Sequence, residues 1–262
     1  MIKCMCMCLA LILLLTLQVQ AETSEEFKTV MLAAAKGDER QQYNLAHFYA
    51  NGVGVEKSIP KAIYWYDIAA KAKDAGVRYK IGLLYELGTV LEQDLIKSFG
   101  HYLYSAQNGD PFGQTNLALM YFYGKGTEKD IEQGIYWAEK AATKGFVNAQ
   151  LNLAMLYSSK KMGVKNKDKA IYWYKKAVAL NNDVAQYELA RIYLHEKSYD
   201  KSIELFELSM ENDNTNAMIL LAMMFDKALG VKKDTSKAVE LLNTANNLGN
   251  KKAGVLLQSL KK

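Results

Sequence analysis

The stretch Ala149-Gln150-Leu151-Asn152-Leu153-Ala154-Met155-Leu156-Tyr157 decides the fold of this chain, because it recurs with a fixed spacing. Its closing tyrosine belongs to a series whose members lie 36 residues apart, namely Tyr49, Tyr85, Tyr121, Tyr157 and Tyr193. Similar blocks stand ahead of the first and third tyrosines, at residues 42–46 and 114–118. A period of this length is typical of stacked helix pairs, so the sequence indicates a repeat array.

Each repeat holds two amphipathic stretches joined by a turn that contains glycine. In the first stretch Ala149, Leu153 and Tyr157 are spaced to share one helical face, a spacing that a strand does not produce. The second stretch carries the motif Ile-Tyr-Trp, which begins at residues 63, 135 and 171. Both prolines, Pro60 and Pro111, fall where a helix would begin. The sequence therefore predicts an all-α fold of stacked antiparallel helix pairs, one pair in each 36-residue repeat.

A small residue stands three positions before the closing aromatic residue of each first stretch. Such residues allow close approach of two helices, and the large aromatic side chains fill the neighbouring space. We therefore predict that both the small residues and the repeated tyrosines and tryptophans lie in the core. The small residues are Ala46, Gly82, Ala118, Ala154, Ala190 and Ala222.

With these motifs the chain resembles the Sel-one-like repeats, a subclass of the tetratricopeptide superfamily. The third and fourth units match best, since Leu117-Ala118-Leu119-Met120-Tyr121 is followed by Gly124-Lys125-Gly126 and then by Trp137 and Gly145. The resemblance runs from about residue 33 to the end. It implies a right-handed α-solenoid of about six units with partial terminal units, which we assign to residues 22–262.

Three departures from the repeat pattern carry information. In the second unit His101 replaces the tryptophan, so that helix should pack less tightly. The fifth unit is four residues short, because it passes from Tyr193 to Leu205 in twelve positions where the others take sixteen. In the last units Phe225 and Leu241 replace the tyrosine and the tryptophan. Terminal repeats of solenoids are commonly atypical, because they face water on one side.

Residues 1–21 have the layout of a secretory signal peptide. Lys3 precedes an apolar run that is too short to span a bilayer comfortably, and Ala21 supplies a small residue at the cut. We expect an exported protein, periplasmic or secreted, with no membrane span after cleavage; an uncleaved anchor is the alternative. The three cysteines (Cys4, Cys6 and Cys8) all lie in this segment, so the mature chain would have no thiol chemistry and no disulfides.

Charge gives a weaker clue to function. The 33 basic residues against 28 acidic ones are too nearly balanced to favour nucleic acid as a partner. Lysines nevertheless crowd the fourth unit, where Lys160, Lys161, Lys165, Lys167, Lys169, Lys175 and Lys176 face a single Asp168. An acidic block follows in the fifth unit. The basic stretch could contact an acidic partner or membrane headgroups, or it could be an ordinary solvated surface.

No arrangement of residues predicts catalysis or metal binding. The three histidines, His47, His101 and His195, fall in three different units without a partner at metal-ligand spacing. No phosphate-binding glycine loop and no nucleophile elbow occurs, and the Gly-x-Gly pairs follow helices and not strands. We therefore predict no enzyme activity, no metal and no cofactor, with His101 filling a core position.

The candidates for partner binding are polar residues at repeated positions of the first helices, which the resemblance places on a concave groove. They stand seven positions before the tyrosine (Gln42, Gln114, Gln150 and Gln186) and five positions before it (Asn44, Lys80, Asn116, Asn152 and Glu188). A ladder of amides could hydrogen-bond the backbone of an extended peptide. The alternative is that these side chains hold neighbouring helices together.

Two classes of function follow. The first is an exported scaffold or adaptor, expected to be monomeric, that binds a protein or peptide through the groove in envelope signalling or host interaction. The second is an exported enzyme acting on cell-wall or lactam substrates, as the resemblance to cysteine-rich relatives implies; the missing cysteines argue against it. A structural component of the envelope differs from the scaffold only in its partner.

Processing by a signal peptidase should give a mature N-terminus at Glu22, because Val19 and Ala21 stand before the cut. Intact-mass measurement on protein recovered from the periplasm or the medium checks this expectation. A full-length species retained with membranes would contradict it.

Overall fold

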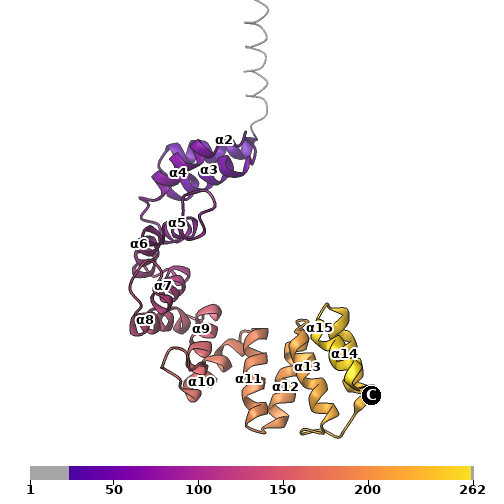
Figure 1. Cartoon of the computed structure of the whole chain (residues 1–262). Helices are drawn as coiled ribbons and strands as arrows, with labels where there is room; N and C mark the ends of the chain where they lie inside the picture. The colour runs from indigo at the N-terminus through magenta and orange to yellow at the C-terminus, as the bar shows by residue number, and fades with distance from the viewer. Residues whose placement is uncertain (1–23, 261–262) are drawn as a thin grey trace, which may run out of the picture. The chain divides into compact units, whose positions relative to one another are not determined.

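The computed structural model describes residues 24–260, and every regular element in that range is an α-helix (Figure 1). The predicted signal peptide, residues 1–21, lies outside the described residues. The chain forms two compact units, and the boundary between them falls inside one helix, between Trp137 and Ala138. No helix in the described range is long and apolar enough to span a membrane.

The first unit begins with a single helix, and helix pairs follow it. Its helices are α2 (Glu25–Ala35), α3 (Glu39–Asn51), α4 (Ile59–Ala69), α5 (Ala75–Leu87), α6 (Leu95–Gln107), α7 (Pro111–Tyr123) and the beginning of α8 (Ile131–Thr143). Within this unit α3 packs against α4, and α5 packs against α6.

The second unit repeats the arrangement and closes on a single helix. Its helices, after the end of α8, are α9 (Val147–Ser158), α10 (Lys167–Val178), α11 (Asp183–His195), α12 (Tyr199–Met210), α13 (Thr215–Asp226), α14 (Thr235–Asn247) and α15 (Lys251–Leu260). The pairs are α9 with α10, α11 with α12, and α13 with α14. The predicted all-α array of helix pairs is confirmed.

One backbone hydrogen bond closes each helix pair. The residue that precedes the second helix donates its N–H to the carbonyl of the repeated tyrosine: Ser58 to Tyr49 at 2.8 Å and Asn166 to Tyr157 at 2.9 Å. The shortened fifth repeat keeps this hydrogen bond, from the Ser198 N–H to the Tyr193 carbonyl at 2.9 Å. The bond satisfies a carbonyl near the end of the first helix and fixes where the second helix begins.

The helix ends follow the local chemistry of the sequence. Side chains of Asp or Asn cap the first helices α3, α5, α7, α11 and α13, whereas α9 has Phe146 at this position and no side-chain cap. Asp110, for example, accepts from the Gly113 N–H at 2.7 Å. Pro111 then occupies the first turn of α7, as predicted, where its missing N–H costs nothing. At the other end Gly124 adopts a left-handed conformation, with φ of 68°, which only glycine accepts readily.

The predicted small residues all lie in the core. Five of them are alanines with at most 1% exposure, and the sixth is the buried Gly82 of α5. A Cβ atom added to Gly82 would lie 2.8 Å from the ring of Tyr102 on α6. The two helices of this pair therefore approach so closely that the position tolerates no side chain.

The aromatic residues divide into buried and exposed members. Tyr157 and Trp173 are buried as predicted, with 3% and 7% exposure. Tyr85, Tyr121 and Trp65 are only half-buried, which departs from the prediction. His101, which replaces the tryptophan of the second repeat, stacks on Tyr85 at 5.6 Å. Tyr172, which precedes the tryptophan in the Ile-Tyr-Trp motif, is 52% exposed and meets the Trp173 ring edge-to-face.

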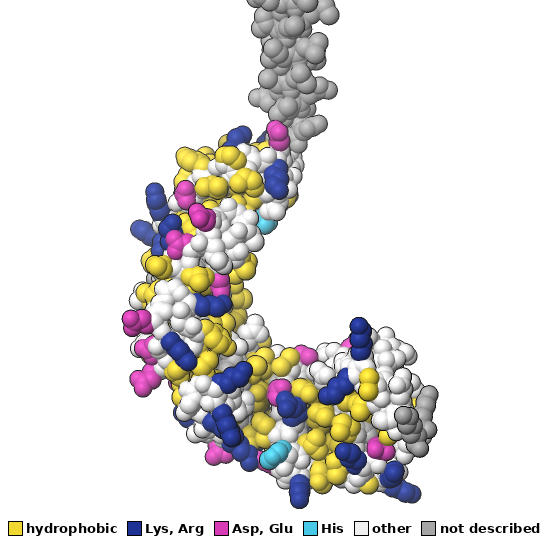
Figure 2. All heavy atoms as spheres, in the orientation of Figure 1, with side chains coloured by type: hydrophobic (Ala, Val, Ile, Leu, Met, Phe, Trp, Pro, Cys, Tyr) yellow, Lys and Arg dark blue, Asp and Glu magenta, His cyan; other side chains and the backbone are white. Residues whose placement is uncertain are grey.

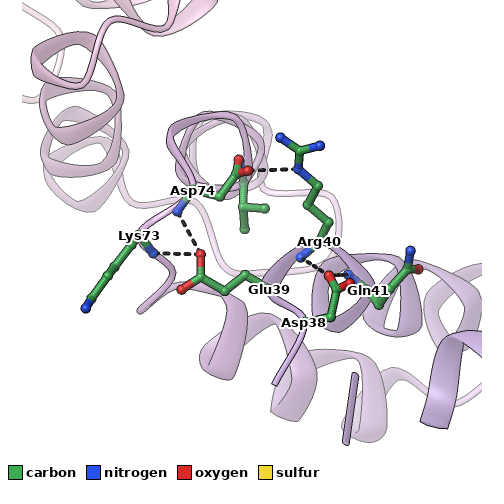
Figure 3. A network of polar contacts seen from close by, with 7 residues as sticks. Asp38, Glu39, Arg40, Gln41, Lys73 and Asp74 are labelled. Carbon is green, nitrogen blue, oxygen red and sulfur yellow. Dashed lines mark hydrogen bonds and ion pairs between the residues drawn. The ribbon is translucent and has the colours of Figure 1, made fainter. Parts of the chain in front are cut away.

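Polar contacts tie successive first helices together at their N-termini (Figure 3). One carboxylate oxygen of Glu39, at the start of α3, accepts from the backbone N–H groups of Lys73 and Asp74 at 2.9 and 2.8 Å. Arg40 donates to the Asp74 carboxylate at 2.8 Å. Although partial burial opposes the effect, hydrogen bonds from Val77 and Arg40 hold the pKa of Asp74 below its ordinary value.

Two helical glycines provide a matched test of close packing. Gly82→Ala should lower the free energy of unfolding by about 1–2 kcal/mol, because the new methyl group meets Tyr102 and the helices must separate. Gly100→Ala on α6 meets no atom within 4 Å, and it should raise the free energy by about 0.5–1 kcal/mol through better helix propensity. Urea unfolding of both variants measures the difference. Equal effects would show that the close approach is absent.

Candidate partner-binding surface

The predicted glutamines occupy one position of the first helices and share one structural role. The side-chain amide of each donates backwards: Gln42 to the Ala34 carbonyl at 3.3 Å, Gln114 to the Ala106 carbonyl at 3.1 Å, and Gln150 to the Ala142 carbonyl at 3.0 Å. Gln186 donates to the Asn181 side chain at 2.9 Å. The three carbonyls lie near the end of the preceding helix, where each also accepts from the backbone N–H three residues further on, so the glutamine is a second donor that joins two helices.

Arg78 takes this role in the second repeat (residues 77–110), where the sequence has no glutamine at the equivalent position. Its guanidinium donates to the Ala70 carbonyl at 2.9 Å and lies 4.3 Å from the Tyr104 ring centre. Gln114, Gln150 and Gln186 are buried, and their side-chain oxygens are shielded from solvent. These amides serve the contact between helices, so we leave the glutamines out of the binding surface proposed below.

The five residues that stand five positions before the tyrosine lie nearer to solvent. Lys80 is exposed, and Asn44, Asn116, Asn152 and Glu188 are half-buried. Asn44 donates to the Gln41 side chain at 3.0 Å, and Lys80 lies over the Tyr43 ring at 4.9 Å. Glu188 pairs with Arg191 at 2.8 Å. These contacts are local and partly open to water, so four of the five side chains are available to a partner; the exception is Asn116.

Asn116 belongs to a polar cluster on α5, α6 and α7. The Tyr102 hydroxyl donates to Glu86 at 2.9 Å, and Lys125 lies 3.6 Å from the same carboxylate. Burial raises the pKa of Tyr102 and of Tyr79, and a hydrogen bond with Asn116 partly offsets the rise in both. Asn116 therefore contributes to the fold of the first unit as well as to its surface.

Residues that the sequence analysis missed continue the same helical face. They stand two positions before the tyrosine (His47, Leu83, Leu119, Met155 and Arg191) and two positions after it (Asn51, Leu87, Tyr123, Ser159 and His195). Steps of three and four residues from the predicted position lead to them. That spacing could have identified them. We call these two sets, with the five residues that stand five positions before the tyrosine, the first-helix face.

In the first unit this face and its border expose large apolar side chains. Leu87 is 58% exposed and Tyr123, at the end of α7, is 62% exposed, while Phe112, at the beginning of α7, is 48% exposed. Phe112 lies 5.3 Å from Tyr79, so the apolar surface adjoins the Asn116 cluster. Figure 2 shows hydrophobic side chains at the surface of the first unit. Exposed large apolar side chains at a repeated helix position are candidates for an interaction surface.

His101 and the other titratable groups give no sign of a metal centre. Burial, with a smaller contribution from Arg78, lowers the pKa of His101 to about 4, so its imidazole is neutral at physiological pH. Among residues 24–260 no group of three or more His, Cys, Asp or Glu side chains is placed to hold a metal ion.

Comparison with known proteins identifies the repeat. The model of the Sel1 repeat matches six successive segments, at residues 42–74, 77–110, 111–146, 147–182, 183–214 and 215–250. No curated protein sequence matches the chain.

Two solved structures resemble the whole array. A Sel1 repeat protein from Oxalobacter formigenes is 27% identical with a TM-score of 0.53, and the match covers 90% of this chain and 80% of that one. The antigen c5321, described as protective and present in uropathogenic Escherichia coli strains, has an SLR fold. It is also 27% identical, with a TM-score of 0.50 and coverage of 89% of this chain, and the chain spans 59% of its length.

Substitutions in the two predicted series, seven and five positions before the tyrosine, should change the free energy of unfolding by different amounts. Gln150→Ala removes the buried hydrogen bond to the Ala142 carbonyl, which keeps only the Gly145 N–H as donor, and should lower the free energy of unfolding by about 0.5–1.5 kcal/mol. Asn152→Ala, two residues along the same helix and half-exposed, should change it by less than about 0.5 kcal/mol. Urea unfolding compares them. A larger loss from Asn152→Ala would show that the second series also holds the fold.

Proposed function

Because the chain belongs to the Sel1 repeat family, we propose that it is a scaffold or adaptor that binds a partner protein through the first-helix face. Repeat proteins of this family generally mediate interactions between proteins. Their scaffold is typically non-catalytic, which favours binding over an enzymatic role.

The exposed apolar side chains of the first unit carry this proposal. Leu87 and Tyr123 stand at the same repeat position on α5 and α7, and both present more than half of their surface to solvent. Neither side chain is needed to close a helix pair, because the pairs are closed by the backbone and by smaller residues. Large exposed apolar and aromatic side chains are the usual anchors of a protein interface.

Polar groups beside these anchors can set the orientation of a bound segment. Lys80 lies on the same face, and the Lys125–Glu86 pair borders it. Among the half-buried amides of the first unit, Asn44 offers its carbonyl oxygen and one amide N–H to a peptide backbone, since its other N–H donates to Gln41. An extended segment held by apolar anchors and by side-chain amides is the binding mode that we propose.

We further propose that the protein acts outside the cytoplasm, in envelope signalling or host interaction. The layout of residues 1–21 supports export. The likeness to c5321, a protective antigen, supports an exposed location.

Site-specific crosslinking tests the proposed face. A photoreactive phenylalanine analogue at Tyr123 should give a crosslinked partner when the protein is produced in its own cells. Tyr64 on α4 provides the control, because it has the same residue type and the same 62% exposure but lies on a second helix.

The two positions should behave differently. A product at position 123 with none at position 64 supports the first-helix face, and mass spectrometry of the product identifies the partner. Products at position 64 alone would place binding on the opposite helices.

A further inference from the structure

The second unit contains a hollow of about 640 Å³ beside the beginning of α10. It lies between the connection at residues 159–166, the first turn of α10 and the last turns of α11. Its lining residues are Ser158, Lys165, Lys167, Ala170, Glu188, Arg191, Ile192, His195 and Glu196. A hollow of this size is in the range of binding sites.

The shortened turn between the two helices of the fifth repeat explains why the hollow is open. In the third and sixth repeats the turn between the two helices covers the beginning of the preceding second helix. Gly126 lies directly against Leu95 at the start of α6, and Gly230 lies against Tyr199 at the start of α12. The corresponding turn of the fifth repeat consists only of residues 196–198. It does not cover the start of α10, where the hollow lies.

Cations outnumber carboxylates in the hollow. Lys167 pairs with Glu196, and Arg191 pairs with Glu188 at 2.8 Å, so each carboxylate already has a cation beside it. Lys165 has no carboxylate partner among the described residues. Ala170 and Ile192 add an apolar part to the lining.

The surroundings strengthen the positive charge. Residues 158–176 contain seven lysines and the single acidic residue Asp168. All seven lysines are exposed. Figure 2 shows dark-blue side chains gathered over α10. Clustered charge of one sign attracts a partner of the opposite sign and speeds its association.

We propose that this hollow binds an acidic segment of a partner protein, with an Asp or Glu side chain held by Lys165, Lys167 and Arg191. The proposal rests on the proposed scaffold function and names the chemistry of one partner segment. Arginine and lysine form charge-assisted hydrogen bonds with carboxylates, and the apolar part of the lining accommodates the stem of the entering side chain. The bound carboxylate compensates the charge of Lys165.

A narrow peptide fits this site better than a membrane or a phosphate cluster does. The site is a hollow, and a flat bilayer reaches only its rim. Glu188 and Glu196 lie inside and would repel closely spaced phosphates, whereas single carboxylates along a peptide can alternate with them.

The probe for this proposal is a fluorescein-labelled decapeptide of alternating Glu and Ala, measured by fluorescence polarisation at low salt. The intact mature chain should bind it, and should not bind the matching Gln-Ala or Lys-Ala peptides. The double variant Lys165→Gln/Lys167→Gln should weaken binding by roughly tenfold or more, since charge-assisted hydrogen bonds are lost.

A second double variant controls for general attraction. Lys175→Gln/Lys176→Gln removes the same charge from the last turn of α10, outside the hollow, and should weaken binding by less than about threefold. Equal weakening by both double variants overturns the proposal. Binding of anionic phosphatidylglycerol vesicles that depends on Lys165 and Lys167, without binding of the peptide, would also overturn it.

Closing the hollow gives an independent test. Replacing residues 196–198 with the seven residues 124–130 of the third unit restores the usual turn and keeps the net charge unchanged. This variant should keep its helix content by circular dichroism and lose peptide binding. Unchanged binding in the folded variant would show that the peptide binds elsewhere.

The outcomes separate this proposal from the proposed function. Loss of peptide binding leaves the crosslink at position 123 unaffected if both proposals hold, because Tyr123 lies in the first unit and the hollow lies in the second. A crosslink at position 123 without any binding of the acidic peptide overturns the hollow alone. Absence of both overturns the scaffold function as well.

Discussion

The structure depends on the backbone bond that closes each helix pair, from the residue before the second helix to the carbonyl of the repeated tyrosine. The bond is present with a turn of ordinary length, as between Asn166 and Tyr157, and with the shortened turn between Ser198 and Tyr193. It fixes the crossing point of the two helices, so that a small residue such as Gly82 can face an aromatic ring. The remaining first-helix positions are then free to vary without loss of the fold.

The buried side-chain amides also hold the helices of the array together. A glutamine or an arginine near the start of a first helix reaches back to a carbonyl at the end of the preceding helix, and the contact joins one repeat to the next. Each of the carbonyls that the glutamines reach also accepts from a backbone N–H of the turn, so the side-chain amide adds a second, buried bond between helices. Apart from Asn116, the polar side chains five positions before the tyrosine make no such contact between helices. The repeat thus separates positions that hold the array from positions that can hold a partner.

The two proposed surfaces arise in different ways. The face of the first unit comes from residue choice, since Leu87 and Tyr123 place large apolar groups where other units place polar ones. The hollow in the second unit comes from chain length, since residues 196–198 are too short to cover the start of α10. A solenoid tolerates both kinds of change because each repeat contacts mainly its neighbours, so an alteration in one unit is not transmitted to the whole core.

The sequence by itself determined the repeat, the helix pairs, the caps and the small core residues, because each follows from local spacing and from the chemistry of single residue types. The sequence also predicted looser packing where His101 replaces the tryptophan, but α5 and α6 approach closely there, with Gly82 against Tyr102. Only the tertiary structure decided which of two polar series faces inward. Gln150 and Asn152 stand two residues apart with similar amides, and their fates differ because only the first lies within reach of the Ala142 carbonyl. The hollow likewise depends on how the turn of the fifth repeat meets α10 of the fourth repeat. The residue spacing within a single repeat does not give that contact.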